Sequence, residues 1–401
     1  MLKNLLNPDR PVSVDGVGLI LTLMFMHLVG PQAVILQPAF VDGMVGQLGF
    51  DPVQAGYVAA SENTGKAVQS LLMMILVTRV NWRYLFYGAL AVLIAGNLIC
   101  TVVDDYQTFR VVRFFTGVAN GTIVPLCYVV VGLTAAADRN FGLLMVSLMT
   151  YAAVIFFAIP TIFAMAGLVG LLLVFAAFAS LAIPLVRNVP THGEQPSGAN
   201  EGVLTLSWGF RGMALGAMFF YFVATFAVWT YMSLIGRDTG IPEQQVANAL
   251  TLSQFAGIAG AGIAVLLGSR FGRAWPLAIS LVGSMVSLVI LGSYRTAMGF
   301  AVAACIFQLL WNTTHPYLLG AHASFDRSGR QVTYAVAMQM MGIAAGPAIA
   351  AWILTLPGGG YARIIALSTA LLAITALLIQ PPVLRESSLS GKRKLAAAPS
   401  H

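Results

Sequence analysis

A carboxylate and an amine stand together in the middle of a long apolar run. Glu62 and Lys66 carry the charges between positions 52 and 77, where the other residues are uncharged. Residues four apart on a helix lie one turn from each other, so these two side chains and Gln69 form a stripe on one face. Charge at bilayer depth costs about 2.5–3.5 kcal/mol per residue on insertion scales, so in a membrane span this stripe faces protein or an aqueous cavity. The stripe is therefore a candidate functional site.

The overall composition makes a lipid bilayer the expected surroundings of this site. The chain has 401 residues, of which 58% are hydrophobic and 9% are charged, whereas soluble domains carry about 25% charged residues. Its three cysteines fall in apolar runs, a pattern that predicts neither a disulfide framework nor a metal cluster. We interpret the net charge of +7 through membrane topology rather than through nucleic-acid binding. The composition predicts an all-α membrane protein with many spans.

Apolar runs long enough to cross a bilayer, at about 20 residues or more, divide into two sets of six. A polar segment rich in Gly, Pro, Ser and Asn separates the sets and has the composition of a linker. We expect residues 1–186 to form an N-terminal six-helix bundle, 187–209 a linker, 210–384 a C-terminal six-helix bundle, and 385–401 a basic, disordered tail. The predicted spans are 16–40, 52–77, 84–103, 106–133, 141–165, 167–186, 210–236, 243–268, 274–294, 297–320, 331–356 and 361–384.

The distribution of basic residues predicts the orientation of these spans. Fifteen Lys and Arg residues fall on the side of the termini and linker, and Lys66 and Arg113 lie within spans. Four fall on the opposite side: Arg110, Arg237, Arg295 and Arg363. Because cytoplasmic loops carry the excess of basic residues, both termini and the linker are predicted to be cytoplasmic, in a bacterial inner membrane.

The two sets of spans resemble each other. Pro52 opens the second run and Pro242 the eighth, at an offset of 190 residues. Asp138 precedes the fifth run and Asp326 the eleventh, at an offset of 188. Such steady offsets predict a duplicated six-helix unit, an arrangement in which transporters bind substrate near the bilayer midplane between the repeats.

Two loop motifs carry a family resemblance. Gly268-Ser269-Arg270-Phe271-Gly272-Arg273, after the eighth run, is similar to a cytoplasmic loop pattern of the major facilitator superfamily. Val77-Thr78-Arg79-Val80-Asn81-Trp82-Arg83, after the second run, is a degraded counterpart. Both lack the Asp that is usual in the family, since Thr78 and Ser269 stand in its place. We interpret Arg79, Arg83, Arg270 and Arg273 as gating-loop candidates, with ordinary positive-inside anchoring as the alternative.

A third motif, Arg113-Phe114-Phe115-Thr116-Gly117, resembles the Arg-x-x-x-Gly signature that the superfamily uses in proton coupling. The resemblance covers nearly the whole chain and implies twelve transmembrane helices, in two six-helix pseudo-repeats around a central cavity. Arg113 lies about 12 Å and Glu62 about 15 Å from the outer ends of their spans, at 1.5 Å per residue. We therefore expect Glu62 and Arg113 to meet as proton-coupling residues; a structural ion pair is the alternative.

The charge of the expected cavity predicts the substrate class. Lys66, Arg113 and a protonated His27 would outweigh Glu62, which favours a small, anionic, carboxylate-bearing substrate. The polar and aromatic side chains in spans expected to line the cavity are the candidates for substrate binding, with helix packing as the alternative role. They are His27, Gln32, Gln37, Lys66, Gln69, Asn120, Tyr221, Trp229, Gln308, Trp311, Asn312, His315 and Gln339.

The function predicted from these features is proton-coupled symport of an organic anion. Pro357-Gly358-Gly359-Gly360 lacks the Lys and Ser/Thr of an ATP-binding loop, and we expect no enzyme activity, no cofactor and no metal. Protons, the small molecule and the lipid bilayer are the expected partners of a monomer. The alternatives are proton-coupled efflux of amphipathic compounds and a substrate-sensing receptor that does not transport.

Overall fold

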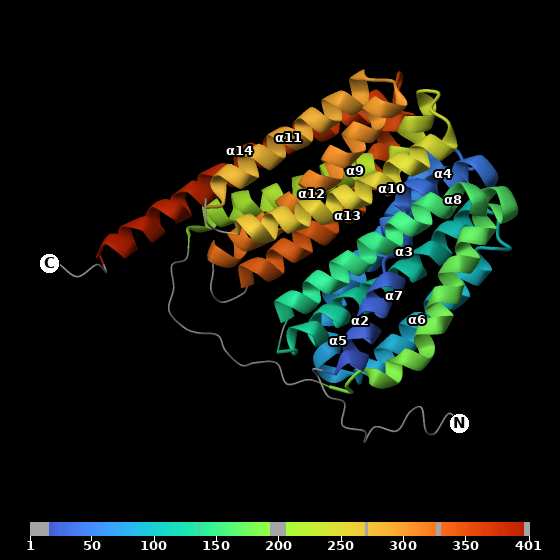
Figure 1. The fold of residues 1–401 in the computed structure, drawn as a ribbon, viewed down its shortest axis with the longest axis horizontal. Coiled ribbons are helices and arrows are strands. Elements are labelled where there is room, and N and C mark those ends of the chain that lie inside the picture. Colours follow the sequence, from blue (N-terminus) through green and yellow to red (C-terminus); the bar gives the residue numbers. More distant parts are fainter. Residues whose placement is uncertain (1–15, 136, 193–205, 269–271, 326–329, 397–401) are drawn as a thin grey trace.

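The computed structural model describes residues 16–135, 137–192, 206–268, 272–325 and 330–396. All the regular elements of these ranges are helices, which confirms the predicted all-α class. Figure 1 shows one bundle in blue and green and a second in yellow to red. The first half contains α2 (Val17–Val29), α3 (Gln32–Ile35), α4 (Gln37–Gln47), α5 (Pro52–Arg79), α6 (Trp82–Ile99), α7 (Tyr106–Gly132), α8 (Ala137–Ala182) and the 3-10 helix η1 (Ile183–Asn188). The second contains α9 (Trp208–Asp238), α10 (Glu243–Leu267), α11 (Ala274–Ser293), α12 (Ala297–Phe325), α13 (Arg330–Thr355) and α14 (Tyr361–Ala396).

The first predicted span is a helix broken twice. Helix α2 ends at Val29 before Pro31, and Leu36 separates α3 from α4. Proline cannot donate a backbone hydrogen bond and disfavours helical geometry in the residue before it. The span is therefore three short helices, which place the side chains of Gln32 and Gln37 beside the breaks.

Helix α5, which carries the Glu62 stripe, begins at a strong local signal. Asp51 accepts a hydrogen bond from the backbone N–H of Gln54, and the Gln54 side chain accepts one from the backbone N–H of Asp51. This capping box satisfies two of the free N–H groups at the helix start, and Pro52 fits the first helical position. The predicted start of this span is confirmed.

Nine helices in the described part of the chain are long and apolar enough to cross a membrane. One of them, α8, has non-helical geometry at Gly167, whose φ of 63° favours glycine, and this bend falls between the predicted spans 141–165 and 167–186. Helix α5 has 28 residues, but its polar stripe lowers its hydropathy. Twelve crossings stay a prediction, in which α2–α4 form one crossing, α5 another and α8 two.

Helix packing repeats between the halves. In the first half α7 packs against α5 and α6, and in the second α12 packs against α10 and α11. Across the halves α5 packs against α13 and α8 against α10. By the predicted offsets, α5 corresponds to α10, and the first part of α8 corresponds to α13. The two contacts across the halves are therefore equivalent under the predicted six-helix repeat. The polar stripe of α5 therefore lies between α7 of its own half and α13 of the other.

The two sides of the molecule differ in how the halves meet. We call the side of Arg187 and Trp208, which flank the linker, the linker side, and the opposite side the far side. On the far side the Tyr231 hydroxyl donates to the Pro52 carbonyl over 2.8 Å, and the Trp229 indole donates to the Val34 carbonyl over 3.3 Å. One hydrophobic cluster continues through both halves there, whereas a second, around Trp82, belongs to the first half alone. The far side is closed by direct contact.

One expectation about the C-terminus is wrong. We expected disorder from residue 385 onward, but α14 continues without interruption to Ala396. Pro381 and Pro382 lie inside the helix, which nevertheless runs on past them. The Arg273 guanidinium lies 4.0 Å from the Glu386 carboxylate, so the extension packs beside the start of α11. The basic composition of the tail had led us to predict disorder rather than a continued helix.

Candidate functional site

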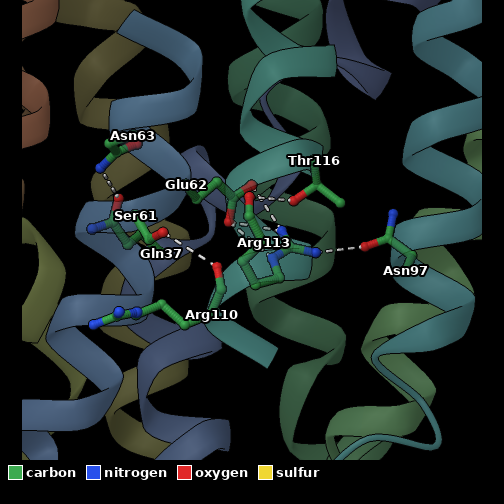
Figure 2. A network of polar contacts seen from close by, with 8 residues as sticks. All are labelled: Gln37, Ser61, Glu62, Asn63, Asn97, Arg110, Arg113 and Thr116. Atoms are coloured by element: carbon green, nitrogen blue, oxygen red, sulfur yellow. Dashed lines mark hydrogen bonds and ion pairs between the residues drawn. The ribbon is translucent and has the colours of Figure 1, made fainter. Parts of the chain in front are cut away.

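Glu62 and Arg113 form a buried, bidentate ion pair between α5 and α7 (Figure 2). Arg113 Nη2 lies 2.7 Å from Glu62 Oε1, and its Nε lies 3.1 Å from Glu62 Oε2. Both residues are at most 5% exposed. Two parallel charge-assisted bonds fix the orientation of both side chains as well as their separation. The meeting of these residues, expected from their matching depths, is present.

Arg113 has further neighbours that the sequence analysis did not identify. Its Nη1 donates to Asn97 Oδ1 of α6 over 2.8 Å, as Figure 2 shows. Its guanidinium also lies over the Phe40 ring of α4, 4.8 Å from the ring centroid. Cations are attracted to aromatic faces at this distance. Arg113 thus holds together four helices of the first half, and a lone Asn in an apolar run was the sequence signal for Asn97.

The ion pair depends on a very close approach of α5 and α7. A Cβ atom added at Gly117 would collide with the Glu62 carbonyl oxygen, and one added at Gly65 would collide with the Phe114 carbonyl oxygen. These are backbone atoms, which cannot move aside as a flexible side chain can. Small residues at such positions let helices pack at backbone contact. Gly117 is therefore required by packing as well as matching the family signature.

Asn63, next to Glu62, faces the other way. Its Nδ2 lies 3.4 Å from Gln37 Oε1 and 3.3 Å from the Ile343 carbonyl of α13 in the second half. Figure 2 shows Asn63 and Gln37 on one side of α5 and Glu62 on the other. Gln37 in turn donates to Thr230 Oγ1 of α9 over 2.6 Å. Helix α5 therefore directs its carboxylate into the first half and its amide toward the second.

Lys66 does not join the ion pair. The amine is on the same helix as Glu62, yet it makes no hydrogen bond or ion pair within the described part of the chain. The Glu62 carboxylate is occupied by Arg113 instead. Lys66 is 8% exposed and lines a cavity of about 510 Å³ between the halves. Glu62 and Arg113 thus form a pair, and Lys66 is a separate cation.

The cavity lies in the linker-side half of the molecule. Helices α5 and α7 supply one wall and α13 of the second half supplies the other. Most of its side chains are apolar, among them Met73, Met74 and Met340. Ser70, Tyr128 and Thr333 add hydroxyl groups. A volume of this size falls in the range of small-molecule sites, about 300–1,000 Å³.

The other predicted binding residues of the first half are not among the residues that line this cavity. His27 Nε2 lies 3.1 Å from the hydroxyl of Tyr128, a cavity residue, and Gln32 donates to the Tyr151 hydroxyl over 3.0 Å. Gln69 packs beside Gly121 of α7. Asn120 is 1% exposed, and neither atom of its amide has a hydrogen-bond partner among the described residues.

The predicted aromatic residues of the second half form a cluster that reaches across to the first. Trp229 contacts Trp311 edge to face at 5.8 Å between ring centroids, and it contacts Phe156 of α8 at 6.2 Å. Tyr221 is fully buried, with its hydroxyl 3.4 Å from the Trp311 carbonyl. Core packing between the halves is the use of these rings in this structure.

The predicted polar stripe on α12 is satisfied mainly within the second half. His315 Nε2 lies 3.1 Å from Gln339 Oε1 of α13. Asn312 donates to the Gln308 carbonyl over 2.9 Å, and the Gln308 side-chain oxygen is buried without a partner among the described residues. The structure thus pairs His315 with Gln339 across α12 and α13, and Asn312 with the Gln308 backbone within α12. None of these four residues is among those that line the cavity beside Lys66.

The loop arginines occupy different environments. Arg79 is exposed at the end of α5, whereas Arg83 is buried and donates from Nε to the Val189 carbonyl over 2.7 Å. Arg83 therefore ties α6 to the segment after η1. Arg273 lies beside Glu386, and Arg270 lies outside the described residues.

An ion pair between the halves was missed entirely. Asp42 Oδ1 of α4 lies 2.7 Å from Arg237 Nη1 of α9. Asp42 lies near the end of the first span and Arg237 was counted only as a basic residue of the far side. Nothing in the spacing of two residues 195 positions apart predicts their contact without the fold.

Comparisons with known proteins agree with this architecture. Residues 214–400 match the family model of the Major Facilitator Superfamily. An uncharacterized MFS-type transporter of Bacillus subtilis strain 168, YbcL, is 22% identical over 345 residues, which span 79% of this chain and 85% of the relative. A crystal structure of a point mutant of the nucleoside transporter NupG has a TM-score of 0.71 at 14% identity and covers 91% of this chain and 99% of its own. The NupG structure without that mutation has a TM-score of 0.69 at 12% identity over 91% and 98%.

The family model covers the second half, the relative most of both halves, and the solved structures share the fold over nearly the whole chain. The Arg113 motif and the glycine contacts beside it lie in the first half and agree with the same assignment. The chain is therefore similar to membrane transporters of the major facilitator superfamily, by family model over its second half and by the relative over most of its length.

Proposed function

We propose that this transporter moves a small organic anion across the bacterial inner membrane by alternating access, coupled to protons as a symporter. The observation that carries the proposal is Lys66, a cation more than nine-tenths buried that lines the cavity between the halves and forms no ion pair among the described residues. Removing a charge from water without pairing it is strongly unfavourable. An anionic substrate would supply the missing partner.

The ion pair on the same helix is the proposed coupling element. Glu62 is held by Arg113 on the face of α5 turned away from the second half, one helical turn from Lys66. Protonation of Glu62 would release the guanidinium and change the local charge by one unit, which would alter the contact between α5 and α7. The alternative is that the pair only neutralises two buried charges; a test that separates accumulation from exchange decides between them.

In this proposal the linker side faces the cytoplasm, as do both termini. The moving halves are residues 1–186 and 210–384, joined by the linker 187–209 and followed by the tail 385–401, in a monomer. The cavity then opens toward the cytoplasm while the far side is closed, an inward-facing state. Alternating access would require the far-side contacts to break and the linker-side walls to meet.

Substrate and direction have two rivals. The apolar wall of the cavity also fits efflux of amphipathic compounds, which differs in the direction of proton-coupled movement. The solved neighbours named above are nucleoside transporters, and at their identities the likeness is one of fold, so uridine belongs in the test as a neutral competitor. A receptor would bind the ligand without exchanging it.

Counterflow in proteoliposomes tests the proposal. Vesicles containing the purified protein are loaded with one unlabelled solute from a panel of carboxylates and uridine, and uptake of the labelled solute is followed. We expect exchange of at least one carboxylate by the native protein and its loss in Lys66→Ala. An imposed inward proton gradient should drive accumulation under symport and reduce it under efflux. Exchange of uridine alone, or binding without exchange, would refute the proposed function.

A further inference from the structure

The cavity beside Lys66 combines one charge with an extended apolar wall. Met73, Met74, Val77 and Met340 contribute to this wall from both halves. Met74, which lines the cavity, is 55% exposed, so it is not covered by other parts of the described chain. Methionine is unbranched and polarizable and adapts to apolar ligands of different shape. The wall is therefore suited to a flexible hydrocarbon body rather than to a densely polar solute.

The charge of the cavity favours a ligand with one negative charge. Among its described lining residues, Lys66 is the one with a charged side chain at neutral pH. Glu62 and Arg113 neutralise each other outside the cavity wall. A ligand with one anionic group would compensate Lys66, whereas a second carboxylate would be buried against apolar side chains without a partner, at a high cost in desolvation.

A second hydrogen-bond donor lies next to Lys66, where it could help to bind a carboxylate. Ser70 lies one helical turn further along α5, and its hydroxyl is buried without a hydrogen-bond partner among the described residues. It can donate to one oxygen of a carboxylate whose other oxygen meets the Lys66 ammonium. The Tyr128 hydroxyl, on the facing helix α7, is already engaged by His27. Two donors on successive turns of one helix, with an apolar wall beyond them, define an oriented site.

We propose that the substrate is an amphipathic monoanion, a monocarboxylate with an aliphatic or aryl body, whose carboxylate binds Lys66 and Ser70 and whose body lies along the methionine wall. This assignment rests on the proposed transport of an organic anion and narrows it. The walls of the site come from α5 and α7 in one half and α13 in the other. The ligand would therefore bridge the halves, as a transported substrate must.

Binding measurements on the native protein in lipid nanodiscs test this assignment. The probes are octanoate, succinate, octylammonium and uridine, which vary the head-group charge and the apolar body separately. We expect octanoate to bind at least about tenfold more tightly than the other three, because among these probes it alone combines a single anionic head group for Lys66 with an apolar body for the methionine wall. Equal binding of octylammonium would indicate partition into lipid and would refute a Lys66-centred site.

Three variants separate charge from packing. Lys66→Met removes the charge and keeps an unbranched side chain, and should weaken octanoate binding about ten- to a hundredfold. Lys66→Arg should restore most of the binding, and Ser70→Ala should weaken it a few-fold. If Lys66→Met does not fold, the comparison of Lys66→Arg with Ser70→Ala still tests the head-group contact. Unchanged octanoate affinity in every folded variant would overturn the proposal.

Counterflow distinguishes this inference from the proposed function on which it rests. Exchange of octanoate but not succinate, lost in Lys66→Met, supports both. Lys66-dependent exchange of succinate without octanoate overturns the amphipathic class and leaves organic-anion transport standing. Absence of exchange for every carboxylate overturns both.

Discussion

Asp42 of α4 and Arg237 of α9 form an ion pair across the far side, with 2.7 Å between Oδ1 and Nη1. The Asp42 side chain is 6% exposed and the Arg237 side chain 42%. Gln37 and Thr230, bonded over 2.6 Å, lie on the same two helices. Polar contacts of this kind are specific to one arrangement of the halves, since they break when α4 and α9 separate. They are therefore expected to hold the far side closed.

Loss of the Asp42–Arg237 pair should favour opening of the far side. Ser233 is buried on the α9 face that carries Arg237, so a cysteine there reports opening to a membrane-impermeant maleimide. With the three native cysteines replaced by alanine, Asp42→Asn should raise the labelling rate of Ser233→Cys up to about fivefold. This limit follows because an ion pair with one half-exposed partner contributes about 0.2–1 kcal/mol.

The same labelling assay contains its own controls. Arg237→Gln should match Asp42→Asn, and the double variant should add little to either, because each single change already removes the pair. Arg237→Lys keeps the charge and should label near the starting rate. Identical labelling in all of these variants would show that the pair does not hold the far side closed.

Glu62→Gln should separate proton-driven accumulation from exchange. The substitution keeps the shape of the side chain but removes the group that can carry a proton, so exchange of substrate should persist while accumulation under a pH gradient is lost. Breaking a buried ion pair costs about 3–5 kcal/mol, so the thermal midpoint of each variant is measured alongside. Glu62→Asp keeps the carboxylate and should retain some accumulation. A parallel fall of exchange, accumulation and folded yield would instead identify a purely structural pair.

Asn97→Ala should destabilise the protein through Arg113. The guanidinium Nη1 would lose its acceptor in a buried site, and an unsatisfied buried donor costs about 1–3 kcal/mol. Gln244→Ala is the matched control, because it removes a side-chain hydrogen bond to Asn248 on an exposed surface, where changes stay within about 0.5 kcal/mol. The measurement is the thermal midpoint in detergent. Equal midpoints for the two variants would contradict a supporting role for Asn97.

The features that could be predicted from the sequence are those that depend on local capping residues and on the regular rise of a helix. Apolar run length predicted the long helices, and Pro52 marked the start of α5. Matching depth along two helices was enough to predict that Glu62 meets Arg113. These inferences succeed because helix geometry converts sequence position into depth.

What the sequence did not predict depends on the angle of each helix to its neighbours. Lys66 was expected beside Glu62, yet Glu62 points toward Arg113 and Lys66 toward the cavity. Asn97 and Asp42 gave no pattern of their own, because single polar residues in apolar runs have no preferred partner until the fold is known. The Asp42–Arg237 contact follows from the way the fold brings α4 and α9 together.

The contact of Gly117 with the Glu62 backbone gives a prediction that does not depend on the substrate. Gly117→Ala places a Cβ against the Glu62 carbonyl oxygen, so α5 and α7 must move apart and the ion pair must lengthen. Gly88→Ala, on α6, is the control because a Cβ there meets nothing within 4 Å. Alanine is favoured over glycine in a helix by about 1 kcal/mol, so Gly88→Ala should hold or raise the thermal midpoint. Gly117→Ala should lower the midpoint and the transport rate together, and a midpoint equal to that of Gly88→Ala would show that the helices are not in backbone contact.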